Sequence, residues 1–382
     1  MTSGQESSDR GFAAAPYSEI ESLAGAFHPH AIEVQDFSYY SLVIDVRSRA
    51  EYEDDHIPGA VQIELPPVLG ELPDTRAEDR MKDAVGSAWG NSAAHDIPAA
   101  LAVVVRPVRL DQAILIYCGR GGLVSRPLAE ALRWRGWTVD VLPGGWINYR
   151  RWVQAGLEVL PRLVAFRVIA CSLGSEAARV LRALREVGHQ VLDIEEVAGW
   201  RHGAMGVPLA PQPAQAWFES QLMQAIRGFD PRSPVWVGDL GSHAGSLSLP
   251  GALTYALAIA PMASMQAEVA ERVSRRQEDE LLLHAELSDL IQAVAALSPT
   301  PSSKLLAHWR LLAVKGVTDL LSSVLTDYID PAYAEGAAER STGRHSLPPL
   351  VVDSLAPSAL AAAARAWYRP PELGALAGEL PQ

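Results

Sequence analysis

The stretch AILIYCGRGGLVSRPLAEALRWRGWTVDVLPGG, residues 113–145, contains a strand, a glycine-rich loop, a helix and a second strand. Its first six residues are apolar and predict a buried strand that ends at Cys118. The segment SRPLAEALRWRGW predicts a helix with Ser125 as its cap and Pro127 in the first turn. TVDVL predicts the next strand, which ends at two glycines. Strands that alternate with helices in this way form a parallel sheet covered on both faces.

The flanking sequence extends this sheet into a complete α/β domain. SLVIDV (41–46) and VQIEL (61–65) predict two more strands, separated by a charged segment with a turn at Pro58–Gly59. Residues 66–110 contain five prolines and predict an irregular helical insertion. WINYRRWVQAG predicts a closing helix. We therefore expect an α/β domain over residues 36–160, preceded by a lead-in over residues 1–35.

A second α/β unit is predicted over residues 163–335. After its first strand, LVAFRVIA, the segment SEAARVLRALREVG predicts a helix, and QVLDIEE and SPVWVGDL predict further strands. From about residue 260 to 330 the pattern predicts mostly helix, and DYIDPAY (327–333) predicts a helix-ending turn at Asp330–Pro331. Residues 336–382 form an alanine- and proline-rich tail with one weak helix.

Composition limits the classes of protein that fit the chain. The 382 residues are 48% hydrophobic with a net charge of −13 and two cysteines. Two cysteines cannot form a disulfide framework, which favours a reducing, cytoplasmic setting. No apolar stretch reaches the length that spans a bilayer, and the polar start has no signal-peptide core, so we expect no membrane partner. No cysteine–histidine cluster has zinc spacing, so no metal is expected.

The basic residues are concentrated in one part of this acidic chain. Residues 118–185 hold eleven arginines against four carboxylates, a local charge of +7. Two interpretations remain open at this point. The arginines form solvated helix faces, or they form a surface that guides a polyanion despite the acidic total.

The loop after Cys118 has the residue types that activate a thiol. A cysteine reacts as its thiolate, which forms where the potential is positive. Gly119, Gly121 and Gly122 allow backbone amides to turn inward, and Arg120 adds a positive charge. These features favour a nucleophilic Cys118. The alternative is an inert, buried cysteine, which is a common structural residue.

Two motifs give the chain a family resemblance. VIDVRSRAEYEDDHIPGAVQI resembles the first half of a rhodanese domain, and YCGRGGLVSRPLAEALRWRGWTVDVLPGGW resembles the second half. The resemblance implies that Cys118 carries a sulfane chalcogen. It also implies that Asp45, Arg47 and Glu51 support the site. The active-site loop that it implies consists of Cys118, Gly119, Arg120, Gly121, Gly122 and Leu123, with Ser125 just beyond.

Over residues 36–335 the chain is similar to the tRNA 2-selenouridine synthases, which join a rhodanese domain to a P-loop domain. This similarity implies replacement of sulfur by selenium at wobble 2-thiouridine, through a persulfide or selenopersulfide on Cys118 and a geranylated intermediate. It implies selenophosphate or a sulfane-sulfur donor as substrate and no tightly bound cofactor. The implied partners are tRNA and a selenophosphate synthase or sulfur-donor protein. The candidate RNA- or anion-binding residues are Arg126, Arg150, Arg151 and Arg201.

The chain departs from the family pattern at the first loop. The family loop is Cys-x-Arg-Gly-Gly-x-Arg-Ser, and Val124 stands in the place of its second arginine. Arg126 lies two residues further on, where helical spacing predicts that it points elsewhere.

The phosphate-binding loop departs further. Gly174 and Ser175 fit the family P-loop, but Glu176, Ala177 and Ala178 replace its glycine, lysine and threonine. A P-loop needs that lysine for phosphate charge and that hydroxyl for Mg²⁺. The acidic family segment at 238–242 keeps only Asp239. We therefore expect a degenerate P-loop that binds no nucleotide.

Three functions remain open from the sequence. The first is a chalcogen transferase of the selenouridine synthase type with Cys118 as carrier. The second is a plain rhodanese sulfurtransferase whose second domain is a scaffold. The third is a non-catalytic family member that binds tRNA or a partner protein.

Overall fold

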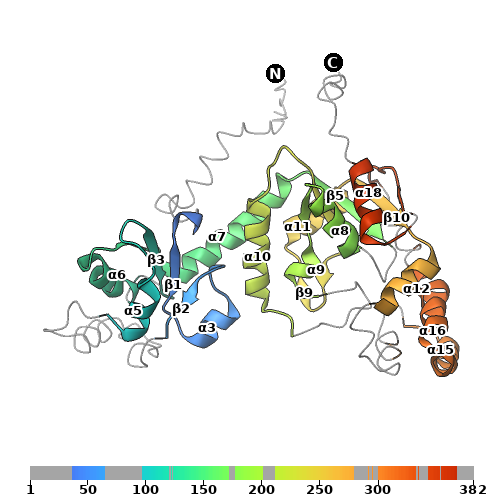
Figure 1. Cartoon of the computed structure of the whole chain (residues 1–382), viewed down its shortest axis with the longest axis horizontal. Helices are drawn as coiled ribbons and strands as arrows, with labels where there is room; N and C mark the ends of the chain where they lie inside the picture. Colours follow the sequence, from blue (N-terminus) through green and yellow to red (C-terminus); the bar gives the residue numbers. More distant parts are fainter. Residues whose placement is uncertain are drawn as a thin grey trace, which may run out of the picture. The chain divides into compact units, whose positions relative to one another are not determined.

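The computed structural model divides into two compact units, Met1–Tyr149 and Arg150–Gln382, whose elements are labelled in Figure 1. The predicted lead-in and most of the insertion predicted at 66–110 lie outside the described residues. The structure describes residues 37–64, 97–119, 122, 124–171, 177–200, 211–278, 291, 295, 300–332, 334, 343–352 and 354–367.

The first unit is built on a four-stranded parallel sheet in the order β2-β1-β3-β4. All five residues of its central strand β3 are buried, because helices cover both faces. In the register, Asp45 at the end of β1 pairs with Tyr117 at the end of β3. The strands are β1 (Leu42–Asp45), β2 (Val61–Gln62), β3 (Ala113–Tyr117) and β4 (Thr138–Val141).

Apolar side chains at helical spacing attach the helices to this sheet. On α6, Leu128, Ala129 and Leu132 join α5 residues and the strands in one buried cluster. Figure 1 shows α5 and α6 on one side of the sheet and α7 on the other. The helical segments of the first unit are η1 (Phe37–Tyr39), α3 (Arg49–Asp54), α5 (Ala99–Val105), α6 (Ser125–Trp134) and the first turn of α7 (Gly145–Val159). The rest of α7, from Arg150 onward, and η3 (Leu160–Arg162) belong to the second unit.

The second unit contains a separate five-stranded parallel sheet in the order β11-β10-β5-β7-β6. A short antiparallel hairpin, β8–β9, follows β7. Together the two sheets confirm the predicted α/β fold class. The strands are β5 (Phe166–Cys171), β6 (Gln190–Leu192), β7 (Val235–Gly238), β8 (His243–Ala244), β9 (Leu247–Ser248), β10 (Met262–Gln266) and β11 (Leu350–Val351).

The helices of the second unit form two apolar cores. One cluster joins α8 and α18 to the sheet. The other gathers α12, α15 and α16 around the fully buried Trp309, whose indole N–H donates to Ser323 Oγ at 3.1 Å. The helical segments are α8 (Ala177–Glu186), α9 (Ile194–Val197), α10 (Gln215–Arg227), α11 (Gly251–Ile259), α12 (Val269–Glu278), α15 (Ser303–Lys315), α16 (Val317–Val324), the π-helical η5 (Leu325–Ile329) and α18 (Pro357–Trp367).

The sequence prediction of the second sheet was incomplete. β10 lies where mostly helix was predicted, and it pairs between β5 and β11. β11 and α18 lie within the predicted tail, yet Leu350 and Leu360 are buried in the core around α8. Pairing with neighbouring strands, rather than local propensity, makes these short segments strands.

The predicted helix-ending turn at Asp330–Pro331 was wrong. The π-helical segment η5 precedes it, and helix continues through Pro331. The Asp330 N–H donates to Leu325 O, five residues back, and this wider turn accommodates a proline that has no N–H. The Asp330 carboxylate accepts two bonds of 2.9 Å from Arg272 of α12.

We predict that Leu360→Ala destabilises the second unit by about 2–5 kcal/mol, because it opens a cavity in the core around α8. Leu311→Ala, on the exposed face of α15, is the matched control and should change the unfolding free energy little. Urea denaturation monitored by tryptophan fluorescence measures both. Equal stability of the two variants would mean that α18 does not belong to this core.

Candidate active site

Cys118 lies at the end of the central strand of the first unit, with 5% of its surface exposed. The hydroxyl of Ser125 donates to its Sγ at 3.4 Å. The prediction that Ser125 caps α6 was therefore wrong. Val124 is the N-cap and makes no side-chain cap bond, and Ser125 is the first helical residue. The serine hydroxyl therefore bonds to the sulfur of Cys118 and not to the backbone at the helix end.

Backbone and carboxylate contacts fix the start of the loop after Cys118. Trp146 N donates to Cys118 O at 2.9 Å, and Ile147 N donates to Gly119 O at 3.3 Å. Glu51 lies near Gly119, since a Cβ built on Gly119 would be 3.9 Å from its Oε1. Its other oxygen accepts from Ser48 in the capping box of α3. Glu51 therefore lies beside the first glycine of the loop.

The end of the same loop is covered by Arg126. Gly122 has φ +83°, and a Cβ built there would lie 2.7 Å from Arg126 Nε and 2.9 Å from its Cγ. The side chain of Arg126 thus packs over Gly122, four residues earlier. The backbone bond from Arg126 N to Gly122 O, 2.8 Å, holds the two residues together. Arg120, Gly121 and Leu123 lie outside the described residues.

A buried ion pair between Asp45 and Arg47 lies beside the end of β3, which Cys118 directly follows. Arg47 Nη2 lies 2.7 Å from Asp45 Oδ2, and the Arg47 side chain is 2% exposed. Arg47 Nε also donates to both carboxylate oxygens at 3.1 Å, and Nη2 donates to Asp55 O at 2.5 Å. Burial lowers the pKa of Arg47, but the hydrogen bond and charge of Asp45 outweigh burial and raise the pKa above its ordinary value.

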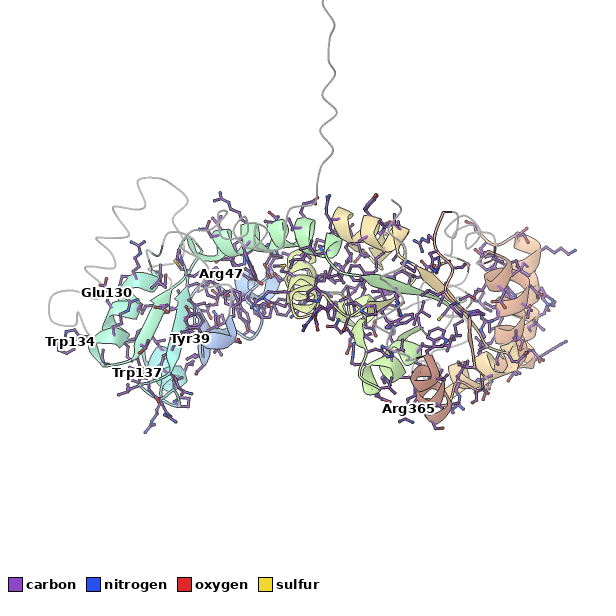
Figure 2. The ribbon with its side chains drawn as sticks, turned by 90° about the horizontal axis from the view of Figure 1, so that it is seen from above. Tyr39, Arg47, Glu130, Trp134, Trp137 and Arg365 are labelled. Atoms are coloured by element: carbon purple, nitrogen blue, oxygen red, sulfur yellow. The ribbon has the colours of Figure 1, made fainter. Side chains whose placement is uncertain are left out.

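Two aromatic rings complete this support, and sequence reasoning did not identify their role. The guanidinium carbon of Arg47 lies 4.7 Å from the ring centre of Trp146 and 5.7 Å from that of Tyr117. Burial raises the pKa of Tyr117 well above its ordinary value, with a further contribution from Asp45. Its hydroxyl accepts from Ile57 N at 3.1 Å. Their positions in the sequence could have indicated this role. Tyr117 directly precedes Cys118, and Trp146 directly follows Gly144 and Gly145. Figure 2 shows Arg47 within the first unit and Trp134 at its surface.

Of the predicted P-loop residues in the second unit, the structure describes only Ala177 and Ala178. Gly174, Ser175 and Glu176 lie outside the described residues, whereas Ala177 begins α8. A Cβ built on Gly238, at the end of β7, would lie 3.5 Å from the Ala177 Cβ. Positions 177 and 178 therefore present methyl groups where the family pattern has an ammonium and a hydroxyl.

Arg150 does not belong to a nucleic-acid surface, contrary to the sequence prediction. It is buried and pairs with Glu219 of α10 at 2.5 Å. It also donates to Ala216 O at 2.9 Å and to Ser220 Oγ at 3.1 Å. These bonds attach α7 to α10, so this charge is already neutralised. Arg151 is exposed, and Arg201 lies outside the described residues.

Two glutamines near the start of α10 hold the β8–β9 hairpin in place. Gln212 donates to Ala244 O at 2.9 Å and accepts from Ser246 N at 2.7 Å. Gln215 donates to Ser248 O at 2.9 Å and accepts from Ser248 N at 3.0 Å. The segment PQPAQAWFESQL (211–222) thus positions the chain that follows β7.

Known proteins match both units. A model described as a rhodanese-like domain matches residues 31–151. A model described as the tRNA 2-selenouridine synthase AAA domain matches residues 164–298. A solved structure, the BH2092 protein from Bacillus halodurans, aligns at 17% identity with a TM-score of 0.20 over 35% of this chain and 77% of that chain, and carries no argument.

Curated relatives give the same assignment. The tRNA 2-selenouridine synthase of Cronobacter sakazakii is 30% identical over 62% of this chain and 64% of that protein. The enzyme of that name from Nitrosomonas europaea is 26% identical over 69% of this chain and 70% of that protein. The one from Salmonella paratyphi B is 28% identical over 79% of this chain and 83% of that protein. The chain thus spans just under two thirds of the Cronobacter relative's length.

The fold and the thiol loop define a rhodanese-like domain followed by a P-loop-like α/β domain. Both family matches and these relatives support the assignment of the chain to the tRNA 2-selenouridine synthase family. Among the described residues, no helix has the length and hydrophobicity needed to cross a membrane.

We predict that Arg47→Met destabilises the first unit by about 3–5 kcal/mol, because it leaves the Asp45 carboxylate buried without its partner. Arg49→Met is the matched control. It removes an exposed pair with Glu53 and should leave stability almost unchanged. Denaturant unfolding of both variants tests this, and a small loss for Arg47→Met would show that the pair is dispensable.

Proposed function

We propose that this protein replaces sulfur by selenium at the wobble 2-thiouridine of tRNA, with Cys118 as the chalcogen carrier. The observation that carries the proposal is the position of Cys118. It ends the central parallel strand, its Sγ accepts a hydrogen bond from Ser125, and Arg126 lies over its loop. The printed names of the relatives support tRNA selenation as the activity.

The loading step needs only a thiolate and a donor with a sulfane atom. With thiosulfate, Cys118 Sγ attacks the outer sulfur, an Sγ–S bond forms, the S–S bond of thiosulfate breaks, and sulfite leaves with the electron pair. With selenophosphate, Sγ attacks the selenium, an Sγ–Se bond forms, the P–Se bond breaks, and phosphite leaves with the electron pair. A second thiol then attacks Sγ, the S–Se bond breaks, a disulfide forms, and selenide is released with the electron pair. Selenide adds to C2 of the base, a C2–Se bond forms, the C2–S bond breaks, and the sulfur leaves as hydrogen sulfide.

A second candidate is a plain rhodanese sulfurtransferase. The observation that favours it is the pair of methyl side chains, Ala177 and Ala178, at the start of α8. A family member without phosphate binding loses the step that depends on the P-loop, while the Cys118 chemistry of the first unit continues. Selenation assays on 2-thiouridine tRNA separate the two functions.

We predict that thiosulfate adds one sulfane sulfur to the wild-type protein and none to Cys118→Ser. The matched control is Cys171→Ser, which should load like the wild type because Cys171 is buried beside Met265 with Sγ 3.9 Å from the thioether sulfur. Intact-mass spectrometry measures the added atom. Absence of loading on Cys118 would favour the non-catalytic alternative, in which the chain binds tRNA or a partner protein.

We further predict that the second unit binds neither nucleotide nor geranyl pyrophosphate at about 100 μM. Loss of the lysine and gain of a carboxylate remove close charge-assisted contacts, which weakens binding by about two to four decades. Isothermal titration calorimetry tests the wild-type protein, and Glu176→Gly with Ala177→Lys should restore part of the heat. Micromolar binding by the wild type would contradict the degenerate P-loop.

A further inference from the structure

Helix α15 of the second unit has one half in the core and one half in solvent. Trp309 is fully buried in the cluster shared with α12 and α16, and α15 packs beside α16 (Figure 1). With 3.6 residues per turn, the remaining side chains share the opposite half of the helix, and all of them are exposed. The other residues of α15 that pack against the cluster are Leu305, Leu306, Leu312 and Ala313.

The exposed half of α15 is positively charged. The helix contains no aspartate or glutamate. The side chains of Lys304, Arg310 and Lys315 make no hydrogen bond or ion pair with any residue that the structure describes. The next carboxylate along the chain is that of Asp319, in the first turn of α16. This surface therefore carries three full positive charges in a chain whose net charge is −13.

The charges lie along the edges of the exposed half, with apolar residues between them. Lys304 and Lys315 lie at one edge together with His308, and Arg310 lies at the other. The strip between the edges consists of Ala307, Leu311 and Val314. At 1.5 Å per residue, Lys304 and Lys315 are about 16 Å apart along the axis. One strand of a duplex presents a phosphate about every 3.4 Å along its axis, so this length can meet several phosphates.

The chemistry of this surface favours a nucleic-acid backbone over a lipid bilayer or a second copy of the chain. A helix that inserts into lipid needs a broad apolar face, but Trp309 and three of the four leucines of α15 already pack into the core. A second copy would bring like charges together. Phosphates, in contrast, pair with the cations at the edges, and sugars contact the short apolar strip.

We propose that the exposed half of α15 binds the sugar–phosphate backbone of tRNA. This proposal rests on the function proposed above and adds a binding surface for its substrate. The surface lies beyond the residues matched by the AAA-domain model, which end at 298. Of the arginines expected from sequence to bind RNA, Arg150 is already neutralised by Glu219. Because phosphate contacts carry no sequence information, α15 contributes affinity and not sequence selectivity.

The experiment measures binding of unfractionated bacterial tRNA to the full-length protein, by filter binding between about 50 and 200 mM salt. The α15 triple variant is Lys304→Gln with Arg310→Gln and Lys315→Gln. It should bind about tenfold more weakly and lower the slope of log affinity against log salt by about two to three. The matched control is Arg49→Gln with Arg109→Gln and Arg162→Gln. It changes the net charge equally, at exposed arginines already paired with carboxylates, and should change affinity less than about twofold.

A single substitution on the apolar strip tests the same surface without touching its cations. Val314→Glu places a carboxylate between the two charged edges and should weaken tRNA binding about threefold. Val314 is 88% exposed, so the core is not disturbed. Val103→Glu, at a residue of α5 that is 71% exposed, is its matched control and should leave binding unchanged.

The outcomes separate this proposal from the function on which it rests. If the wild-type protein does not load from thiosulfate but the α15 triple variant still loses tRNA affinity, the chalcogen-carrier function fails and the α15 surface stands. If the wild-type protein binds no tRNA at about 50 mM salt, or if both triple variants lose affinity equally, the proposal is overturned. Loss of binding to phosphatidylglycerol vesicles in the α15 triple variant, with tRNA binding unchanged, would identify a lipid surface instead and also overturn it.

Discussion

The site of the first unit depends on the buried pair of Asp45 and Arg47. Asp45 ends β1 and pairs in register with Tyr117, the residue before Cys118. Arg47 then joins this carboxylate to the Asp55 carbonyl and to the ring of Trp146. The Arg47 guanidinium thereby connects the ends of β1 and β3 to the segment after α3 and to the first turn of α7. Because the charges are desolvated, only a fully bonded arrangement is stable, and this constraint fixes where the thiol lies.

The second unit has an α/β architecture that apolar packing stabilises. Its five-stranded sheet, its helix after β5 and the glutamine-held hairpin are all present. Apolar packing between α8, α18 and the strands stabilises this sheet. Ala177, the first residue of α8, packs against the same cluster.

Much of this molecule could be predicted from sequence, and the errors have physical causes. The strand before Cys118, the helix after it and the parallel sheet follow from apolar periodicity. The contact of Arg126 with Gly122 and the hydrogen bond from Ser125 to Cys118 could not be predicted in this way, because each depends on a side-chain rotamer. β10 and β11 escaped prediction because short segments become strands through their neighbours. The arginine-rich sequence around Arg150 likewise did not indicate that an ion pair with Glu219 neutralises its charge.

The order of the second sheet has a consequence for how the chain acquires its structure. β5 pairs with β10, and β10 pairs with β11, which follows the whole helical segment around Trp309. Strands that are distant in sequence must therefore meet before this core closes, which makes folding of the unit slow and dependent on late segments. The first unit has its strands between Leu42 and Val141 and can fold earlier during synthesis. During synthesis from the N-terminus, every strand of the thiol-bearing sheet therefore leaves the ribosome before β10 and β11 of the second sheet.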